Sequence, residues 1–287
     1  MNIIYGIRCH KYNEDIFELY GVLCKLHGDD NVILVCDESE YPVDAPDSVK
    51  KISIKSESLE DLNLPKINKW GWQCGDYFYY AMAEKYQRDY YWLIEPDVLF
   101  GGNCAQDFFS KLNNLSYDFL SCRHEQRDSN WYWHKTILPY SEKVFGCAFP
   151  VTRLSYRAII FLQENRKKAF NSGSHSPNDE AFVSTLLEKG GYNCIDIEKL
   201  IPEYFRHFST MTPLLKEKFR EILGVHHPAL SWPEFKEKYP EKLKSAINHK
   251  KGKGFIKSTL YGVGSDKILE LLESNPGLFF EAFTQSK

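Results

Sequence analysis

The chain has 287 residues, of which 43% are hydrophobic and 26% charged, and its formal net charge at pH 7 is −3. A chain of this length can bury a substantial core, in one large domain or in one domain with an extension. The near-neutral charge excludes a nucleic-acid binder that works through electrostatics. A run of about 20 apolar residues, which a membrane-spanning helix needs, is absent from the sequence.

The eight cysteines are scattered along the chain, and none forms a C-x-x-C pair. Their apolar surroundings favour buried, reduced thiols over disulfides, and their spacing does not suit zinc. The first eight residues have the pattern of a strand and not of a signal peptide, because they lack a basic segment followed by a long apolar one. Together these features predict a cytoplasmic protein.

The first part of the chain predicts a strand at residues 2–7, a helix at 13–26, a strand at 31–36 and a shorter strand at 49–54. Gly28 follows the helix as a suitable cap. This β-α-β-β order is typical of an α/β domain with at least one parallel pair of strands.

The elements expected next are a loop with a helical turn (56–69), an aromatic helix (70–87), a strand (90–102), a short helix (105–112), a strand (117–122), an irregular loop (123–140), a strand (145–151), a helix (154–170), a turn-rich loop (172–178), a helix (179–189), a strand (192–197), a loop or short strand (202–207) and a helix (212–223). The remainder is helical and charged, with a basic patch at 242–257. We therefore expect an α/β catalytic domain over residues 1–230, and a helical extension packed on it over residues 231–287.

The most informative stretch is the strand at 90–102, in which an apolar run is followed by Glu95, Pro96 and Asp97. Proline cannot donate a ladder hydrogen bond, so pairing should stop near it. Two carboxylates at the carboxyl end of a buried strand lie where open α/β sheets bind ligands. They could hold Mn²⁺ or Mg²⁺ together with substrate phosphates, although a solvated acidic turn would have the same sequence.

Further candidates lie later in the chain. Asp179 and Glu180 open a helix, where they either interact with its free N–H groups or accept a proton from a substrate hydroxyl. His207 and the pair of histidines ending at His227 follow the last strand, where each could be a metal ligand, a phosphate partner or a surface residue. Asp76 stands among aromatic residues and needs a partner if it is buried.

The loop at 123–140 carries charged and aromatic side chains, of which four are expected to bind the acceptor sugar: Arg123, His124, Trp131 and Trp133. Three aromatic residues in succession at 131–133 cannot all be buried on one face, so one or two should stack on a ligand ring, such as a sugar, or form an interface. The basic patch at 242–257 could contact phosphate or an anionic membrane surface, and a solvated tail is the alternative.

With these features placed, the sequence resembles the GT-A-type glycosyltransferases, in which a short acidic motif, usually D-x-D, follows a buried strand. Here Glu95-Pro96-Asp97 stands in that position. The resemblance implies a GT-A-like (Rossmann-like) mixed, mostly parallel sheet flanked by helices, with a helical C-terminal appendage. It also implies site residues: Asp97 as the main metal ligand, Glu95 as a ligand through water or a partner of the donor ribose, His227 or else His207 as a further ligand, and Tyr5, Arg8, Asp37 and Asp76 around the nucleoside. Asp179 or Glu180 is the base if the reaction inverts the anomeric centre, and these two residues only position the substrate if the reaction retains it.

The implied reaction is transfer of a sugar from a nucleotide-diphosphate sugar, with a UDP-sugar the first choice, to a hydroxyl of a glycan or glycolipid in surface polysaccharide or lipopolysaccharide assembly. A divalent cation would neutralise the departing diphosphate. The basic C-terminal patch would suit peripheral contact with the inner face of the membrane. Two alternatives stay open: a non-catalytic carbohydrate- or nucleotide-binding protein, and a metal-dependent nucleotidyltransferase, against which stands the lack of a glycine-rich phosphate loop near the first strand.

Overall fold

The computed structural model describes residues 1–67, 69–171, 177–209 and 212–284. The chain divides into two compact units: the first comprises Met1–Pro96 and Gln106–Pro202, and the second comprises Asp97–Ala105 and Glu203–Lys287. The helical segment expected from residue 231 onward lies within the second unit, which also takes the short segment that follows the acidic motif.

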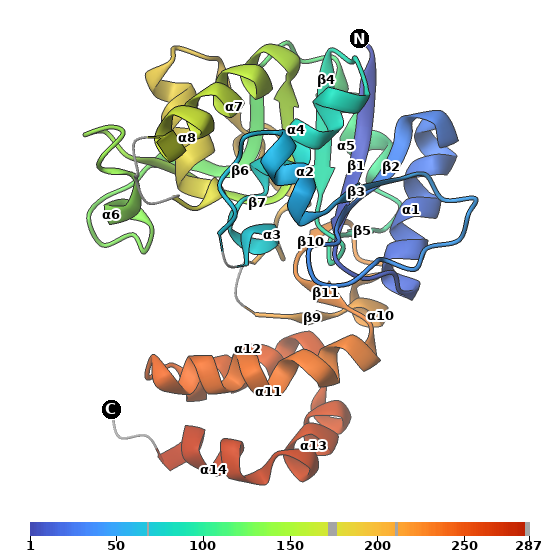
Figure 1. Ribbon diagram of the computed structural model, residues 1–287. Helices are drawn as coiled ribbons and strands as arrows, with labels where there is room; N and C mark the ends of the chain where they lie inside the picture. Colours follow the sequence, from blue (N-terminus) through green and yellow to red (C-terminus); the bar gives the residue numbers. More distant parts are fainter. Residues whose placement is uncertain (68, 172–176, 210–211, 285–287) are drawn as a thin grey trace. The chain divides into compact units, whose positions relative to one another are not determined.

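The first unit is built on a sheet that has seven strands within the described residues, in the order β3-β2-β1-β4-β7-β6-β8 (Figure 1). All of its neighbouring strands are parallel except β7, which runs antiparallel to both β4 and β6. The predicted fold class, a mixed and mostly parallel sheet flanked by helices, is therefore confirmed. The strands are β1 (Ile3–Cys9), β2 (Val32–Asp37), β3 (Lys51–Ile54), β4 (Tyr90–Ile94), β6 (Phe119–Gln126), β7 (Phe145–Ser155) and β8 (Cys194–Asp196).

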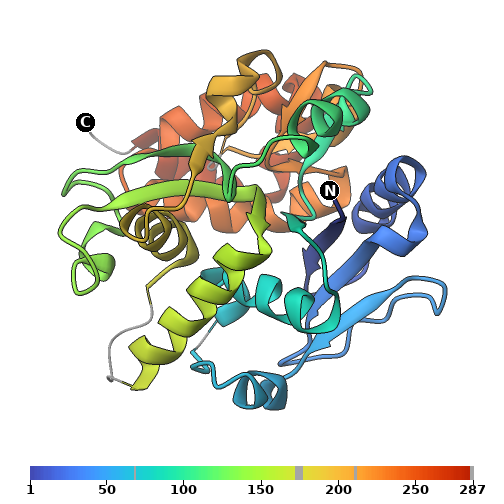
Figure 2. The ribbon, with the colours of Figure 1, turned by 90° about the horizontal axis from the view of Figure 1, so that it is seen from above.

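Helices cover both faces of this sheet. The side chain of Tyr5 on β1 contacts His27 of α1 and Phe109 of α5, whereas Gly6 beside it faces Met82 of α4. Helix α4 packs against α7 (Figure 2). The helices are α1 (Glu14–His27), α2 (Ser56–Asp61), α3 (Trp70–Gln73), α4 (Asp76–Lys85), α5 (Ala105–Asn113), α6 (His134–Ile137), α7 (Tyr156–Asn171), α8 (Asp179–Lys189) and α9 (Ile197–Leu200), with 3-10 turns η1 (Asp29–Asn31) and η2 (Pro202–Tyr204).

Helix α1 shows how local sequence sets these elements. The side chain of Asn13 accepts a hydrogen bond from the backbone N–H of Ile16 at 3.0 Å, which caps the helix start. Gly28 ends it with φ of +82°, a conformation that glycine adopts without strain. The apolar spacing buries one face of the helix, so the helix predicted from this pattern is confirmed.

The strand expected over residues 90–102 is divided between two sheets. β4 is buried and central, as predicted, and its end is marked by the hydrogen bond from the Glu95 N–H to the Pro150 carbonyl at 2.8 Å. Pro96 has no N–H to continue the ladder. The chain then enters the second unit, where β5 (Leu99–Gly101) pairs antiparallel with β10 (Gly224–His226). The prediction that pairing stops near Pro96 is confirmed, whereas the second half of the expected strand finds a different partner.

Two predicted helices also differ. The helix expected over residues 70–87 is interrupted between α3 and α4 at Gly75, where the backbone approaches other side chains closely. The helix expected over residues 212–223 is reduced to α10 (Lys216–Phe219), because β9 (Leu214–Leu215) pairs with β11 (Ala229–Leu230). The turn-rich loop expected at 172–178 falls mostly outside the described residues.

The second unit is completed by four helices: α11 (Trp232–Asn248), α12 (Gly252–Val263), α13 (Ser265–Ser274) and α14 (Pro276–Thr284). They enclose a core of their own, with Phe235, Tyr239, Leu243 and Phe279 among its buried members. This agrees with the helical character predicted for the end of the chain. Over the part of the chain that is described, none of the helices has the length and apolar character needed to cross a bilayer.

Candidate functional site

The carboxyl edge of the sheet in the first unit gathers one arginine and two carboxylates. Arg8 lies near the end of β1, Glu95 follows β4, and Asp179 is the first residue of α8. The Arg8 guanidinium bridges the two acids: Nη2 lies 3.2 Å from Glu95 Oε1, and Nη1 lies 3.5 Å from Asp179 Oδ2. Because β1 and β4 are parallel neighbours, their ends meet at one edge, which is where ligands bind in sheets of this kind.

The break between α3 and α4 forms part of this cluster. The Gly75 N–H donates to Asp179 Oδ2 at 2.7 Å. A Cβ at this position would lie 2.5 Å from Arg8 Nη1 and 2.6 Å from Asp179 Oδ2, so only glycine fits without displacing them. The carbonyl of Trp72 also accepts from Arg8 Nη2 at 3.5 Å.

At the start of α8, the helix cap is provided mainly by a residue other than the two acids, Asp179 and Glu180. Asn178 is the cap residue, and its side chain accepts from the Glu180 N–H at 2.9 Å. Asp179 Oδ1 accepts from the same N–H at 2.8 Å, while Oδ2 faces Arg8 and Gly75. The cap is therefore supplied mainly by Asn178, and the two acids that follow it are placed at the sheet edge.

Both acids hold a proton more readily than usual. Burial raises the pKa of Asp179 to about 7, although the positive charge of Arg8 opposes the rise. Burial, together with the charges of Asp179 and Glu95, raises the pKa of Glu180 to about 8, against the charge of Arg127 and a hydrogen bond from the Trp133 side chain. A carboxylate with a pKa near neutral can accept and return a proton at physiological pH, as acid–base catalysis requires.

The other residues expected around a nucleoside are placed differently. Tyr5 is buried on the face covered by α1 and α5, stacked on His27 with ring centroids 3.8 Å apart. Asp76 is fully buried in an ion pair with Arg166. Asp37, at the end of β2, binds Ser39 through its Oδ1. Of the five residues expected around the donor, the structure brings Arg8 and Glu95 into one ion pair.

Asp37 lies against α3, because a Cβ on Gly71 would come within 2.0 Å of its Oδ2. Asp37 therefore lies at the end of β2, the strand next to β1, and contacts α3, the helix in which the Trp72 carbonyl accepts a hydrogen bond from Arg8.

The second unit brings Asp97 and His227 together. His227 Nε2 lies 3.4 Å from Asp97 Oδ1, and the Ala229 N–H donates to the Asp97 carbonyl at 2.7 Å. Burial alone would raise the pKa of Asp97, but the charge and hydrogen bond of His227 outweigh it and lower the pKa to about 2.

The histidine of this pair is held in one orientation. His227 Nδ1 lies 2.6 Å from the Ser209 carbonyl, which fixes the proton on Nδ1 and turns Nε2 toward the carboxylate. An imidazole held in this way beside a carboxylate has the donor set of a transition-metal site, since the carbonyl supplies the outer partner that metal-bound histidines usually have. His207 lies elsewhere in this unit, against Phe219 and His226.

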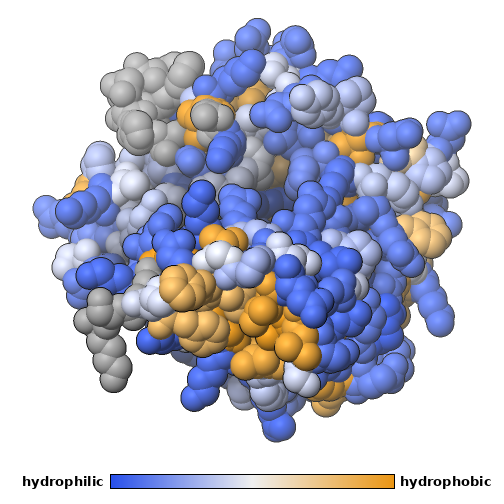
Figure 3. All heavy atoms as spheres, turned by 90° about the horizontal axis from the view of Figure 1, so that it is seen from below, coloured by the Kyte–Doolittle hydropathy of each residue, from blue (hydrophilic) through white to orange (hydrophobic). Residues whose placement is uncertain are grey.

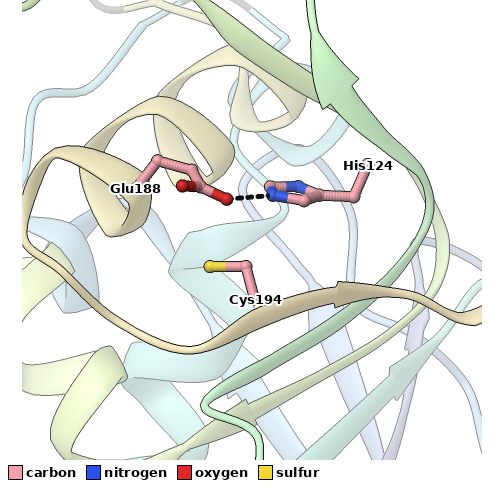
Figure 4. A group of neighbouring side chains, drawn as sticks. All are labelled: His124, Glu188 and Cys194. Atoms are coloured by element: carbon pink, nitrogen blue, oxygen red, sulfur yellow. Dashed lines mark hydrogen bonds and ion pairs between the residues drawn. The ribbon is translucent and has the colours of Figure 1, made fainter.

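Arg123 and His124 face a different part of the first unit. Arg123 pairs with Glu198, with 3.3 Å between Nε and Oε1. His124 is buried, and its Nε2 lies 2.7 Å from Glu188 Oε1 (Figure 4). The structure thus gives both residues carboxylate partners near the end of α8 and the strand that follows it.

Together with Cys194, His124 and Glu188 place three donor atoms within 4.8 Å of one another, a set that could hold Zn²⁺ (Figure 4). The Nδ1 of His124, however, is buried and has no hydrogen-bond partner among the described residues. A histidine that binds a metal normally donates from its second nitrogen. The cluster is accounted for by the ion pair between His124 and Glu188.

The tryptophans of the aromatic loop take two roles. The ring of Trp131 lies over Gly146, where a Cβ would come within 2.4 Å of it, and under the guanidinium of Arg127 at 5.3 Å from the ring centroid. Trp133 donates a hydrogen bond to Glu180. Trp131 is thus a packing residue, whereas Trp133 reaches the acids at the sheet edge.

Sequence reasoning missed three contributors to this site: Gly75, Arg127 and Trp72. The signal for Gly75 was available, because a glycine inside a helical pattern often marks a close approach of the backbone. Nothing local distinguishes Trp72 from its buried neighbour Trp70, or Arg127 from the other charged residues of its loop.

Comparisons with known proteins give a distant likeness only. No family model matches the sequence, and no curated protein matches it. Similar solved structures include an active-site mutant of LgtC (12% identity, 84% of this chain and 96% of that chain covered, TM-score 0.42). They also include the mannosyltransferase PcManGT from Pyrobaculum calidifontis in complex with GDP-Man and Mn²⁺ (10%, 98% and 73%, 0.40) and the inositol-1-phosphate CTP transferase from T. maritima (10%, 68% and 85%, 0.38).

By their names, these structures include glycosyltransferases and a nucleotidyltransferase. At identities of 10–12% and TM-scores of 0.38–0.42, the chemistry of this chain has to be argued from its own side chains.

Proposed function

We propose that this protein is a glycosyltransferase that moves a sugar from a nucleotide-diphosphate sugar to a hydroxyl of a glycan or glycolipid. The observation that carries the proposal is the cluster at the carboxyl edge of the sheet, where Arg8 bridges Glu95 and Asp179 and where Glu180 follows. The pKa values of about 7 for Asp179 and about 8 for Glu180 suit proton transfer from a sugar hydroxyl.

The two acids have different roles in this proposal. Both oxygens of Asp179 are engaged, with the N–H groups of Gly75 and Glu180 and with Arg8. Asp179 therefore positions the cluster, and Glu180 is the general base. Glu180 takes the proton of the acceptor hydroxyl as that oxygen bonds to the anomeric carbon, and the bond between this carbon and the diphosphate breaks with inversion.

Asp97 and His227 are proposed to hold a divalent cation, with Glu95, two residues earlier in the chain, as a further ligand. A set of two carboxylates and one imidazole suits Mn²⁺ better than Mg²⁺, which prefers oxygen ligands. When bound, the cation would neutralise the negative charge on the departing diphosphate. Arg8 and Asp37 are proposed to bind the nucleoside of the donor, with a UDP-sugar as the first choice.

The decisive experiment measures the products of the reaction. The purified protein is incubated with UDP-, GDP- and CMP-sugars, with Mn²⁺ or with EDTA, and in the presence and absence of a mixed glycan acceptor. The proposal is supported if the wild type releases free nucleotide and if Glu180→Gln lowers the rate of this release by about 100-fold or more. Release of pyrophosphate from a nucleoside triphosphate and a sugar phosphate would instead identify a nucleotidyltransferase, and binding without turnover would identify a carbohydrate- or nucleotide-binding protein.

The acceptor is proposed to be a component of surface polysaccharide or lipopolysaccharide that is reached at a membrane. Between residues 242 and 257 the sequence has six lysines and no acidic residue. The nearby helices α13 and α14 expose Leu269, Phe280 and Phe283 by 59%, 72% and 53%, and Figure 3 shows apolar side chains gathered on one face among hydrophilic ones. A basic surface next to exposed aromatic side chains suits an anionic bilayer.

Co-sedimentation with vesicles tests this contact. Binding to vesicles that contain phosphatidylglycerol, and its loss in Phe280→Ser with Phe283→Ser, are the expected results. Equal binding to neutral and anionic vesicles would rule out the role of the lysines.

A further inference from the structure

A group of aromatic side chains is exposed on the first unit, at positions that packing does not explain. Trp72 on α3 is 59% exposed, and Tyr132, just before α6, is 80% exposed. Trp133 is half-buried beside them. Tryptophan is highly buried on average, so a ring left this open in a folded protein indicates a surface for contact with something else.

The three rings form one continuous surface, although Trp72 is about 60 residues from the other two in the chain. The ring centroids of Trp72 and Trp133 are 5.9 Å apart with the planes at 57°, and those of Tyr132 and Trp133 are 4.4 Å apart with the planes at 78°. We refer to Trp72, Tyr132 and Trp133 as the aromatic shelf. The contact between Tyr132 and Trp133 is edge-to-face and that between Trp72 and Trp133 is tilted, so neither contact covers both faces of the Trp72 or the Tyr132 ring.

The aromatic shelf borders the acids at the sheet edge. The Trp133 side chain donates a hydrogen bond to Glu180, and the Trp72 carbonyl accepts from Arg8 at 3.5 Å. Any molecule lying on the shelf would therefore have its next polar group close to a carboxylate whose pKa is raised to about 8.

A ligand that suits both the aromatic rings of the shelf and the nearby carboxylates has the chemistry of a sugar. A pyranose has an apolar C–H face that stacks on aromatic rings and hydroxyl groups at its rim that donate to carboxylates. A purely apolar ligand would leave the nearby carboxylates without polar partners, and an anionic ligand would be repelled by Glu95, Asp179 and Glu180 when these are ionised.

We propose that the aromatic shelf binds the saccharide acceptor, with a sugar face against Trp72 and Tyr132 and the reacting hydroxyl directed to Glu180. This inference rests on the proposed glycosyltransferase function and names its acceptor class as a neutral saccharide. It also replaces Arg123 and His124 of the expected acceptor set by Trp72 and Tyr132, since the former two have carboxylate partners of their own.

The test measures saccharide binding separately from catalysis. Saturation-transfer-difference NMR is recorded with lactose, maltose and chitobiose on the full-length protein, on Trp72→Ala and on Tyr132→Ala. Phe17→Ala is the matched control, because Phe17 is 61% exposed on α1 and belongs to no part of the site. One of the saccharides should give a signal with the wild type and with Phe17→Ala, and binding should weaken about threefold to tenfold in each shelf variant, as expected for the loss of one aromatic contact.

A second readout is the ratio of sugar transfer to donor hydrolysis, which should fall in the shelf variants and stay constant in Phe17→Ala. If no saccharide binds the wild type, or if the shelf variants bind as the wild type does, the shelf is not the acceptor site. If saccharide binding depends on the shelf but no nucleotide sugar is turned over, the shelf proposal stands and the glycosyltransferase proposal fails.

Discussion

Substitution of Asp76 by asparagine separates two roles for this residue, donor binding and support of the core. The Asp76 carboxylate receives two hydrogen bonds from Arg166, from Nε to Oδ2 at 2.7 Å and from Nη2 to Oδ1 at 2.9 Å. Neither side chain is more than 1% exposed. The guanidinium also donates to the Pro177 carbonyl at 2.7 Å and lies 3.8 Å from the centroid of the Phe182 ring.

In Asp76→Asn the charge of Arg166 stays buried and loses its counterion. Removing one partner of a buried ion pair costs about 3–5 kcal/mol. Two charge-assisted hydrogen bonds at roughly 1.5–3 kcal/mol each lead to a similar total. We expect the free energy of unfolding to fall by about 3–5 kcal/mol, which is a large part of the stability of a typical domain. Asp76→Asn combined with Arg166→Gln should recover part of this loss, because it removes the unpaired charge.

The assay is equilibrium urea unfolding of the three proteins, followed by far-ultraviolet circular dichroism, together with donor binding by calorimetry. A variant Asp76→Asn that unfolds at the wild-type urea concentration but no longer binds a nucleotide sugar would refute the reasoning. That result would indicate that Asp76 binds the nucleoside of the donor, as the sequence resemblance implied.

Three further outcomes test the site. Native Asp179 keeps its proton up to a pKa of about 7, so its contribution to stability is complete below about pH 4 and is lost as the pH rises through 7. Thermal unfolding scans from pH 4.5 to 8.5 should show a loss of stability in the wild type that is larger, by up to about 4 kcal/mol, than the loss in Asp179→Asn, where Glu180 still titrates. Gly75→Ala should destabilise the protein by about 1–3 kcal/mol and weaken donor binding, since its Cβ displaces Arg8; calorimetric donor affinity equal to the wild type would contradict the close packing. His227→Gln should raise the Mn²⁺ concentration for half-maximal nucleotide release at least about tenfold, and an unchanged metal titration would remove His227 from the ligand set.

Local sequence was sufficient for several elements. The strand β4 was predicted from its uninterrupted apolar run and the proline that follows it, and the structure confirms both its burial and its end at Ile94. Helix α8 was predicted with the bounds that it has, because acidic residues open it and two glycines follow it. The alternation of strands and helices, a pattern of near neighbours in the chain, predicted an α/β domain with at least one parallel pair of strands. The mixed, mostly parallel sheet was implied by the family resemblance.

Other features depended on partners that are distant in the chain. The helix expected over residues 212–223 failed because Leu214 and Leu215 pair with a strand that begins at Ala229, and pairing of this kind overrides local helical spacing. The strand after Asp97 changes sheets for the same reason. Asp76 was chosen correctly as a residue in need of a partner, but only the fold could name Arg166, 90 residues away.

The sequence alone therefore indicated which residues could carry chemistry, because carboxylates at a strand end and at a helix start can be recognised from the local pattern of residues. The tertiary structure decided which of them meet: Arg8 with Glu95 and Asp179, Asp97 with His227, and Trp72 with Trp133. The physical reason is that a strand or a helix start is specified by interactions within a few residues. A site is specified by distances between segments, and these exist only once the chain has folded.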